Sequence, residues 1–525
     1  MRSVMEHSFS NVPGVEIPRS TFNRSFGKKT TFDADYLVPF LVDEVLPGDT
    51  FNVNTTMMAR LATAINPIMD NIYIETFYFF VPNRLVYDDW HKLLGAQDDP
   101  GDSTDYTTPK LSGGNVDLTD DSLEAELALY MELPYTANLA GDTISGLPFR
   151  AYNLIWREWF RDQNLQDSPE VLTGISAGAG LSLYPLLKRG KRHDYFTSAL
   201  PWPQKGDAVD LPLGTTAPIT GLGVGAGNMA TAGPVSIKEA GDETSYGDYF
   251  TTNTDNFFIN SSTATDDVKV FADLANATSA TINDLRLSFQ LQRLLERDAR
   301  SGTRINEVIK AHFGVDVPDQ RVQRPEFLGG GSSRVNITPV ANTTSIGTQG
   351  ELAAFGIASD SHGFTKSFTE HGFILGLLSA RADITYQQGV DRMWFRDTRY
   401  DYYWPVLSQI GEQAITNNEI FYSGDSAPGN LTFGYQERNA EYRYKQSRIT
   451  GKFLSARSDT LDPWHLSEEF SVLPTLGDTF IQSNTPLDRC IAVPTQPHFI
   501  ADIYCAMKCA RPMPLFGVPG NLDHF

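Results

Sequence analysis

The stretch NIYIETFYFFVP, residues 71–82, decides the fold because it predicts a β-strand that is apolar on both faces. Successive side chains of a strand point to opposite sides, which gives this segment two apolar rows. The rows are Ile72, Ile74, Tyr78 and Phe80 on one side, and Tyr73, Phe77, Phe79 and Val81 on the other. A strand covered on both sides belongs in the middle of a sandwich or beneath a layer of helices, and Pro82 ends it.

The composition favours a large β-rich protein. The chain has 525 residues, enough for about three average domains or for one domain with long insertions. Hydrophobic residues make up 41% and charged residues 20%, while 42 Gly and 30 Pro favour many turns. The formal net charge of −22 excludes a protein coated overall in positive potential. Contact with nucleic acid would therefore be confined to particular basic segments.

The three cysteines, Cys490, Cys505 and Cys509, form an odd and sparse set, which indicates reduced thiols rather than a disulfide framework. No nearby Cys or His completes a zinc site, so we expect buried thiols, no metal and no cofactor. The N-terminal sequence lacks the apolar run of a signal peptide. No segment approaches the ~18 apolar residues of a membrane-spanning helix, so no membrane insertion is expected.

The two ends of the chain both predict extended structure. Residues 1–35 are polar, and their composition predicts a basic arm that contacts a polyanion or is simply solvated. The last residues, from 504 to 525, contain several Pro and Gly and predict an extended tail rather than a helix. The basic residues considered in these two ends are Arg19, Arg24, Lys28, Lys29, Lys508 and Arg511.

The segment TINDLRLSFQLQRLLERDARSG, residues 281–302, predicts an amphipathic helix that ends at Gly302. One side is an apolar stripe expected to face a core, and the other is a row of arginines within about 60° of one another. The stripe is Leu287, Leu291, Leu294 and Leu295, and the row is Arg286, Arg293, Arg297 and Arg300. Spacing alone favours a solvated arginine face, with contact to phosphates or to a neighbouring subunit as the alternative.

The densest positive cluster lies in LKRGKRHDYF, residues 187–196. Its cations are Lys188, Arg189, Lys191 and Arg192. Beside Tyr195 and Phe196, such a loop could hold phosphates and stack a base, or it could be exposed without a ligand. The residues leave both interpretations open.

Two later segments interleave arginine with aromatic residues: MWFRDTRYDYYWP (393–405) and FGYQERNAEYRYKQSR (433–448). Such patterns bind single-stranded nucleic acid by stacking and charge, and they also supply the anchors of protein interfaces. The density of aromatic residues favours an interface. The interface candidates here are Trp394, Tyr402, Tyr403 and Trp404.

Residues 206–278 differ in composition from the rest of the chain. The segment contains no arginine and is rich in Gly, Thr, Ala, Ser and Asn. It is too long for a simple loop, so it must fold on itself or with a neighbour. We interpret it as an acidic insertion that projects into solvent.

The chain shows no motif of a known catalytic class. It lacks a nucleophile elbow, a zinc-protease motif and a phosphate-binding loop. Two carboxylates across a cleft would suffice for a glycosidase, so a β-rich protein that binds or cleaves carbohydrate remains the alternative function.

Several stretches together resemble the major capsid protein of the Microviridae, and most closely the gokushovirus branch of these single-stranded DNA phages. They include FNRSFGKKTTFDADYLVPFLVDEVLPGDTF, FYFFVPNRLVYDDWHKLLG, RPEFLGGGSSRVNI and LDPWHLSEEF, together with the helix, basic-loop and aromatic segments above. The similar stretches span residues from about 20 to about 520 and leave out mainly 96–122 and the insertion.

The resemblance implies a mainly β fold, an eight-stranded antiparallel jelly-roll sandwich with long insertions that carry helices and loops. It divides the chain into a basic arm (1–35), a first part of the jelly roll (36–205), a protrusion (206–278) and the remainder with the tail (279–525). The expected protein is a capsid subunit and not an enzyme.

The resemblance also implies partners. It predicts an icosahedral shell of sixty copies around circular single-stranded DNA, assembled in the bacterial cytoplasm, with minor virion proteins possible and host attachment through 206–278. The expected sequence-independent DNA contacts are Arg19, Arg24, Lys28, Lys29, Lys188, Arg189, Lys191, Arg192, Lys508 and Arg511. Within a shell, the arginine row of 286–300 is expected to contact a neighbouring subunit or another part of its own chain, ahead of DNA.

Overall fold

The computed structural model of the chain describes residues 18–103, 105–111, 115–175, 180–209, 282–343, 348–424 and 426–516. Between 210 and 281 it describes only five short strands. Residues 1–17 of the expected basic arm (1–35) and residues 517–525 of the tail lie outside the described residues. The chain divides into two compact units, Gln204–Arg300 and the remainder.

The strand β5 (Ile72–Pro82) has both faces covered, as the sequence predicts. On one face the ring of Tyr78 lies 5.2 Å from that of Phe364. On the other face the ring of Phe77 lies 5.3 Å from that of Phe160. The strand is an inner member of a four-stranded antiparallel sheet in the order β13-β5-β16-β3. The other three strands are β13 (Glu326–Arg334), β16 (Gly372–Ala382) and β3 (Val38–Val45).

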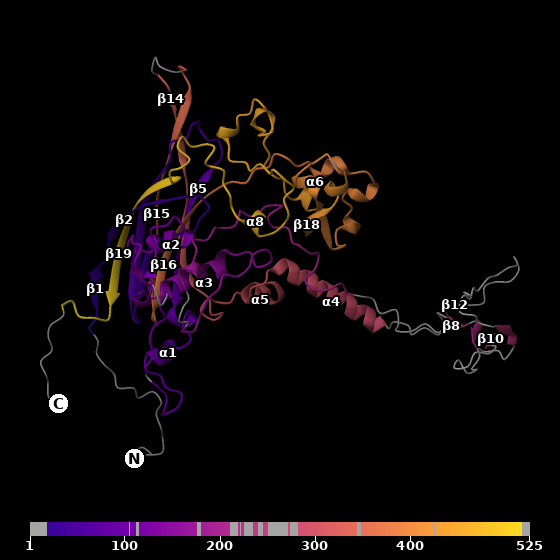
Figure 1. Ribbon diagram of the computed structural model, residues 1–525, viewed down its shortest axis with the longest axis horizontal. Helices are drawn as coiled ribbons and strands as arrows, with labels where there is room; N and C mark the ends of the chain where they lie inside the picture. Colours follow the sequence, from indigo (N-terminus) through magenta and orange to yellow (C-terminus); the bar gives the residue numbers. More distant parts are fainter. Residues whose placement is uncertain are drawn as a thin grey trace. The chain divides into compact units, whose positions relative to one another are not determined.

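A larger antiparallel sheet of six strands packs against the first. Its order is β1-β19-β4-β15-β14, with β2 also paired to β19. The strands are β1 (Ser20–Asn23), β2 (Phe26–Phe32), β4 (Thr50–Leu61), β14 (Asn336–Ala341), β15 (Leu352–Ser367) and β19 (Phe499–Arg511). Figure 1 shows the two sheets side by side, with β14 reaching beyond them at one end.

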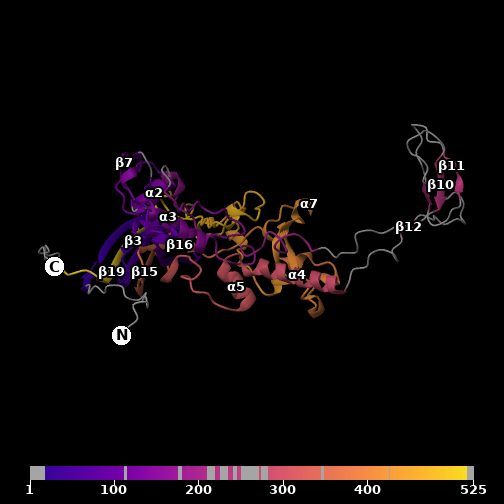
Figure 2. The same ribbon diagram turned by 90° about the horizontal axis from the view of Figure 1, so that it is seen from below.

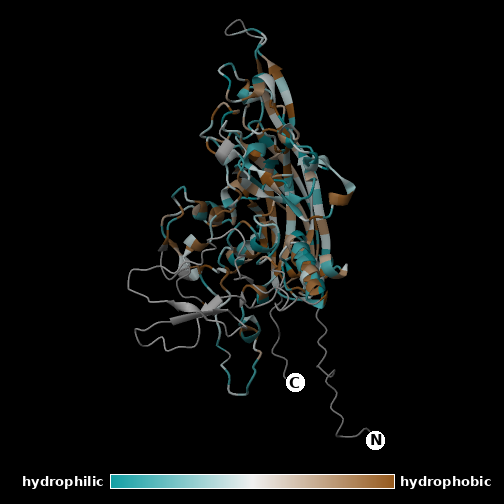
Figure 3. Ribbon diagram, turned by 90° about the vertical axis from the view of Figure 1, so that its right-hand side faces the viewer, coloured by the Kyte–Doolittle hydropathy of each residue, from teal (hydrophilic) through white to brown (hydrophobic). Residues whose placement is uncertain are grey.

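The main hydrophobic core lies between the two sheets. Alternate residues of β4 and β19 are buried, and Figure 3 shows hydrophobic and hydrophilic bands alternating along the long strands. Across the gap, the ring of Phe80 in β5 lies 4.6 Å from that of Phe368, which follows β15. The ring of Phe51 in β4 lies 5.9 Å from the same Phe368. Period-two patterning therefore fixes which side of each strand enters the core.

The expectation of a mainly β, antiparallel fold with helical insertions is confirmed. The strand count differs from the predicted eight, because the two large sheets contain six and four strands. The additional pairing comes partly from β1 and β2, which occupy the same side of β19 one after the other.

Helices cover the far face of the four-stranded sheet. The helices α2 (Leu123–Tyr130) and α3 (Leu147–Ile155) lie beside β3 and β16 (Figure 2). The helix α3 continues past Ile155 as a π-helical turn (Trp156–Phe160). That turn places Phe160 over the outer row of β5. After Pro82 the chain forms the short helix α1 (Trp90–Leu93).

The remaining elements of this unit form smaller groups. The strands β17 (Glu412–Thr416) and β18 (Thr432–Glu437) pair beside a second buried cluster that contains Phe196, Tyr386 and Phe433. The other elements are β6 (Asn115–Val116), β7 (Leu139–Ala140), α5 (Ile305–Phe313), α6 (Asn417–Ile420), α7 (Ser426–Gly429) and α8 (Asp478–Ile481). The helix α5 ends at Gly314, whose φ of +70° is left-handed.

Both chain ends are more ordered than the sequence predicts. Residues 20–32 of the expected arm form β1 and β2. Residues 499–511, which include the first part of the expected tail (504–525), form the long strand β19. Apolar residues alternate along 499–511, which is typical of a strand, but the Pro and Gly that follow dominate the composition of the chain end. Cys505, Met507 and Cys509 all point inward along β19 and are buried.

The triple glycine 329–331 lies within β13. A β-bulge falls between Phe327 and Gly329. A Cβ on Gly330 would meet the carbonyl oxygen of Thr76 at 2.2 Å, and a Cβ on Gly331 would meet the ring of His362 at 2.1 Å. The glycines are therefore required because neighbouring strands approach β13 closely.

The unit Gln204–Arg300 begins close to the predicted insertion and ends later, because it includes most of α4 (Ile282–Ser301). Its short strands are β8 (Ile219–Thr220), β9 (Leu222–Val224), β10 (Val235–Glu239), β11 (Ser245–Tyr249) and β12 (Phe271–Ala272). The predicted helix and its end at Gly302, where φ is +88°, are confirmed. Among the described residues, Leu287 of the leucine stripe is 67% exposed, whereas Leu295 is half-buried.

The basic loop 188–192 closes the outer face of β5 through buried ion pairs. Glu75 of β5 pairs with Arg189, and its Oε2 lies 2.8 Å from Nη2 of Arg381 in β16. Arg381 also donates from Nη1 to the carbonyl oxygen of Gly190 at 2.7 Å. The guanidinium carbon of Arg189 lies 4.6 Å from the ring centre of Phe77, so the loop lies over the strand.

This buried cluster shifts the ionisation of its members. Burial acts to raise the pKa of Glu75, but Arg189 and Arg381 outweigh it, so the pKa lies below the usual value. Burial and the neighbouring Arg381 lower the pKa of Arg189 to about 10. All three groups therefore remain charged at neutral pH.

We predict that Glu75→Gln destabilises the main unit by about 3–5 kcal/mol, because it leaves two buried guanidinium groups without their carboxylate. The urea midpoint of the purified chain at pH 7 measures this loss. Since the pKa of Glu75 is lowered on folding, its contribution is present above the unfolded value of about 4.3 and is lost as pH falls through the folded value. The difference between wild type and variant should therefore shrink below about pH 4.

The matched control is Asp459→Asn, which removes a carboxylate that pairs with Lys452 at the surface. Solvent screens an exposed ion pair, so it contributes little to folding and this variant should keep the wild-type midpoint. Equal effects of the two substitutions would contradict the assigned role of Glu75.

Candidate interaction surfaces

A large exposed group of aromatic and apolar side chains gathers on the segment 393–410 and its neighbour 442–444. We call it the aromatic surface. Val406 is 90% exposed and Trp394 is 73% exposed. Its members are Met393, Trp394, Phe395, Tyr400, Tyr402, Tyr403, Trp404, Val406, Ile410, Tyr442 and Tyr444. The structure thus brings the four predicted aromatic interface residues together on one exposed segment.

Short turns capped by aspartates hold the aromatic surface. Asp391 accepts a hydrogen bond from the backbone N–H of Met393 at 3.1 Å and starts the first turn. Asp401 accepts from the backbone N–H of Thr398 at 2.7 Å. This hydrogen bond lowers the pKa of Asp401. Aspartates at these positions satisfy the first N–H groups of each turn, so the local sequence specifies the loop.

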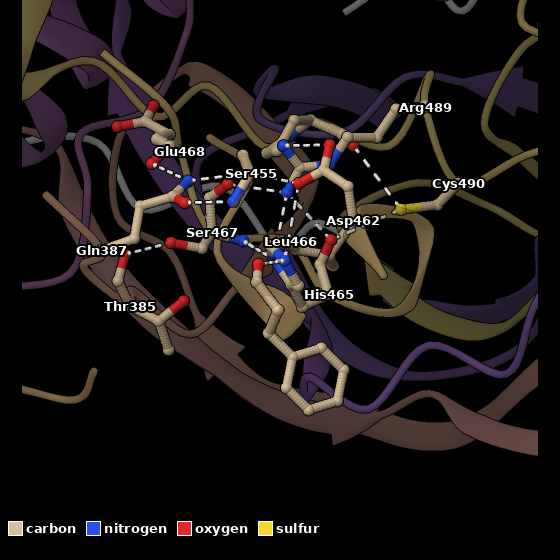
Figure 4. Close-up of polar contacts among 12 residues, drawn as sticks. Thr385, Gln387, Ser455, Asp462, His465, Leu466, Ser467, Glu468, Arg489 and Cys490 are labelled. Atoms are coloured by element: carbon tan, nitrogen blue, oxygen red, sulfur yellow. Dashed lines mark hydrogen bonds and ion pairs between the residues drawn. The ribbon is translucent and has the colours of Figure 1, made fainter. Parts of the chain in front are cut away.

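A polar network fixes the base from which this segment begins (Figure 4). Gln387 donates to Ser455 Oγ at 3.0 Å and to the carbonyl oxygen of Glu468 at 3.1 Å. Arg489 donates to the carbonyl oxygens of His465 at 3.0 Å and Ser467 at 2.7 Å. Three segments distant in sequence are therefore tied together by this network.

Most cations near the aromatic surface are paired with carboxylates of the same chain. Lys445 lies 2.6 Å from Asp391, and Arg396 lies 3.4 Å from Glu441. Arg396 also stacks over the ring of Tyr442 at 4.3 Å. Because these charges are already neutralised, the surface suits a protein partner better than the phosphates of nucleic acid.

Three of the four cations in the basic loop, which the sequence predicts as DNA contacts, are paired with carboxylates of their own chain. Lys191 is 8% exposed and pairs with Glu468. Arg192 lies 3.3 Å from Asp383 and stacks over Tyr73, while Arg189 pairs with Glu75 as described above. Lys188 lies 5.3 Å from the ring centre of Tyr36. We assign these residues to internal packing, since their partners are internal carboxylates and rings.

The candidates near the two chain ends fall into two classes. Three of them pair internally: Arg24 with Asp43, Lys28 with Glu132 at 3.1 Å, and Arg511 with Asp49 at 3.0 Å. The other three are exposed: Arg19, Lys29 and Lys508. Only the second class is free to meet an external polyanion.

Sequence reasoning missed the apolar members of the aromatic surface, Met393, Val406 and Ile410, because isolated apolar residues in a loop resemble core residues. It also missed Arg60, which is exposed on β4. The alternation TFNVNTTMMARL of β4 was the signal that could have placed Arg60 on the outward face.

The described residues contain neither a cluster suited to a metal ion nor an exposed cysteine thiol. Among them, no three His, Cys, Asp or Glu side chains are arranged to hold a metal ion. The cysteines are free and buried, as expected, and burial raises the pKa of Cys490 to about 11. In the part of the chain that is described, no helix is long and apolar enough to cross a membrane.

Comparison with known proteins identifies relatives along the whole chain. The family model of the capsid protein (F protein) matches residues 10–521. The chain is 43% identical over 590 residues to capsid protein VP1 of Chlamydia phage 1, covering 99% of this chain and 98% of the relative. It is 45% identical over 545 residues to capsid protein VP1 of Bdellovibrio phage phiMH2K, covering 99% and 98%.

A third relative is more distant. Capsid protein VP1 of Spiroplasma virus 4 is 32% identical over 545 residues, covering 98% of this chain and 97% of the relative. The resemblance to the capsid proteins of the Microviridae is therefore confirmed, and the carbohydrate-cleaving alternative is set aside. The chain belongs to the phage F capsid protein family, whose members are structural proteins of the virion and not enzymes.

Proposed function

We propose that this capsid protein assembles through the aromatic surface into an icosahedral shell of sixty copies that encloses a circular single-stranded DNA genome. The single observation that carries the proposal is the exposed aromatic surface, most of whose neighbouring cations are paired with carboxylates of the same chain. In our proposal the two large sheets are a jelly roll, and the aromatic surface meets a second copy of the chain.

The energetics support a protein partner for this surface. Soluble monomers rarely expose contiguous apolar patches beyond a few hundred Å². Each large side chain that a neighbour covers completely contributes roughly 1.5–3 kcal/mol. Trp394 and Val406 have the largest exposed fractions among the members, 73% and 90%, so they have the most to gain from coverage.

The helix α4 is the second proposed contact between subunits. Leu287 and Leu291 of its stripe are 67% and 41% exposed. Arg293 and Arg297 of its arginine row are exposed as well. With a net charge of −22, each neighbouring copy offers many carboxylates to arginines such as Arg293 and Arg297. We keep the row as a contact to a neighbouring subunit or to another part of the chain, ahead of DNA.

The remaining parts of the proposal follow from family membership. We propose assembly in the host cytoplasm, with minor virion proteins as further partners. The insertion 206–278, most of which lies outside the described residues, is proposed to contact the host surface. Electron microscopy of the expressed chain is the direct test, because closed particles are expected and a population of monomers alone would refute self-assembly.

We predict that the double variant Trp394→Ser, Val406→Ser lowers particle yield by at least tenfold while the subunit still folds. Buried aromatic anchors of interfaces contribute about 2 kcal/mol or more each, whereas exposed side chains contribute about 0.5 kcal/mol or less to folding. Light scattering measures particle yield, and thermal melting measures folding.

The control for this variant is Val472→Ser, Val493→Ser, which removes two other exposed apolar side chains, 72% and 51% exposed. It should leave the particle yield unchanged. Wild-type yield from the Trp394 and Val406 variant would show that the aromatic surface is not an assembly contact.

We predict that Arg293→Ala, Arg297→Ala impairs assembly more than folding. Both residues lie on the arginine row of α4, where an acidic neighbour would be left unpaired. Sedimentation of the expressed protein compares particles with free subunits. A normal yield of particles would show that the arginine row is a solvated surface and not an assembly contact.

A further inference from the structure

The outward side of the six-stranded sheet is open to solvent. Along β4 and β19 every second residue is exposed through most of the strand, and the alternate residues are buried against the other sheet. The strand register sets Lys29, Asp502 and Met58 side by side across β2, β19 and β4. We call the outward side chains of β1, β2, β4, β14, β15 and β19 the open face (strands in Figure 1).

The open face is nearly free of negative charge. Among the outward positions of these six strands, Asp502 is the single carboxylate. The cations Lys29, Arg60 and Lys508 share the face, and Arg19 at its border donates to Thr50 Oγ1 at 3.4 Å. The whole chain carries 64 acidic against 42 basic residues, so this face has the opposite balance.

Between Lys29 and Arg60 the exposed side chains include the apolar Met58 and Ile500. Toward Lys508 the outward side chains are neutral hydrogen-bonding groups. Ser361 donates to Asn54 Oδ1 at 2.9 Å, and Asn52 donates to Thr365 Oγ1 at 3.0 Å, both across neighbouring strands. These contacts hold the side chains in rows. Since Asn54 accepts through its oxygen, its amide nitrogen remains a donor for a phosphate or a base.

A half-exposed aromatic ring lies in the same surface. Tyr504 is 54% exposed, and its neighbours in register are Gly27 on β2 and Thr56 on β4. A Cβ on Gly27 would meet only the carbonyl oxygen of Ile503, at 3.9 Å, so packing does not require a glycine there. The absent side chain instead leaves one flank of the Tyr504 ring uncovered, as a base-stacking position requires.

We propose that the open face binds single-stranded nucleic acid, with Lys29, Arg60 and Lys508 on phosphates and Tyr504 beneath a base. This inference rests on the proposed function, because it assigns the side of the subunit that faces an enclosed genome. The occupant follows from charge: three cations against the single carboxylate Asp502 favour a polyanion. The aromatic surface, by contrast, has mostly internally paired charges and more apolar area, which suits protein.

The test removes the three exposed cations together: Lys29→Gln, Arg60→Gln, Lys508→Gln. Binding of the purified chain to a thirty-residue oligothymidylate is followed by fluorescence anisotropy at several salt concentrations. Each phosphate contact on a single strand contributes about 0.7 to the slope of log K against log salt, so the slope should fall by about 2. The control triple Lys110→Gln, Arg321→Gln, Lys452→Gln removes three other exposed cations and should keep the wild-type slope.

A second variant tests the stacking position without changing charge. Gly27→Val on the edge strand β2 covers the flank of Tyr504, and a strand tolerates valine well. Loss of one base–aromatic stack weakens oligothymidylate binding by roughly fivefold or more. The salt slope should stay at the wild-type value, because no phosphate contact is lost.

The outcomes separate this inference from the proposed function. Unchanged slopes in the Lys29, Arg60 and Lys508 variant would overturn the nucleic-acid assignment even if particles form normally. If that variant loses particles but binds oligothymidylate as the wild type does, the open face is a contact between subunits. That result would also overturn the nucleic-acid assignment. If the wild-type chain forms no particles, the proposed shell fails, while the salt slopes still decide the binding surface.

Discussion

The buried pairing of Glu75 with Arg189 and Arg381 is the constraint on which the rest of the main unit depends. A carboxylate on a strand that is otherwise apolar on both faces is stable only if cations accompany it into the interior. Those cations come from the loop 188–192 and from β16, so one side chain fixes the loop, closes the outer face of β5 and joins two strands.

Internal pairing decides what each surface can bind. The chain is acidic, yet many of its described cations are held by its own carboxylates, as Lys191 is by Glu468 and Lys445 is by Asp391. A local excess of Lys and Arg in the sequence therefore says little about external charge. The surface character comes from the groups that have no internal partner: exposed rings around Trp394, and a face around Lys508 with a single carboxylate, Asp502.

The sequence predicts those features that local periodicity determines. The two faces of residues 71–82, the helix 282–301 and the exposed aromatic segment 393–405 all follow from spacing and composition. The partners of the basic loop do not, because Glu75 is more than a hundred residues away in sequence. The strand 499–511 was missed because the Pro and Gly that follow it dominated the composition of the chain end.

The aromatic residues of this chain serve two separate purposes, and their location explains how. Phe77 and Tyr78 pack within the sheets, where period-two alternation sets their positions. Trp394 and Tyr403 are carried by turns that Asp391 and Asp401 cap, outside both large sheets. Because the exposed rings contribute little to the core, the subunit can fold completely before a neighbour covers them. Folding and assembly then draw on different residues, so substitutions in the capped turns can change assembly while leaving the sheets intact.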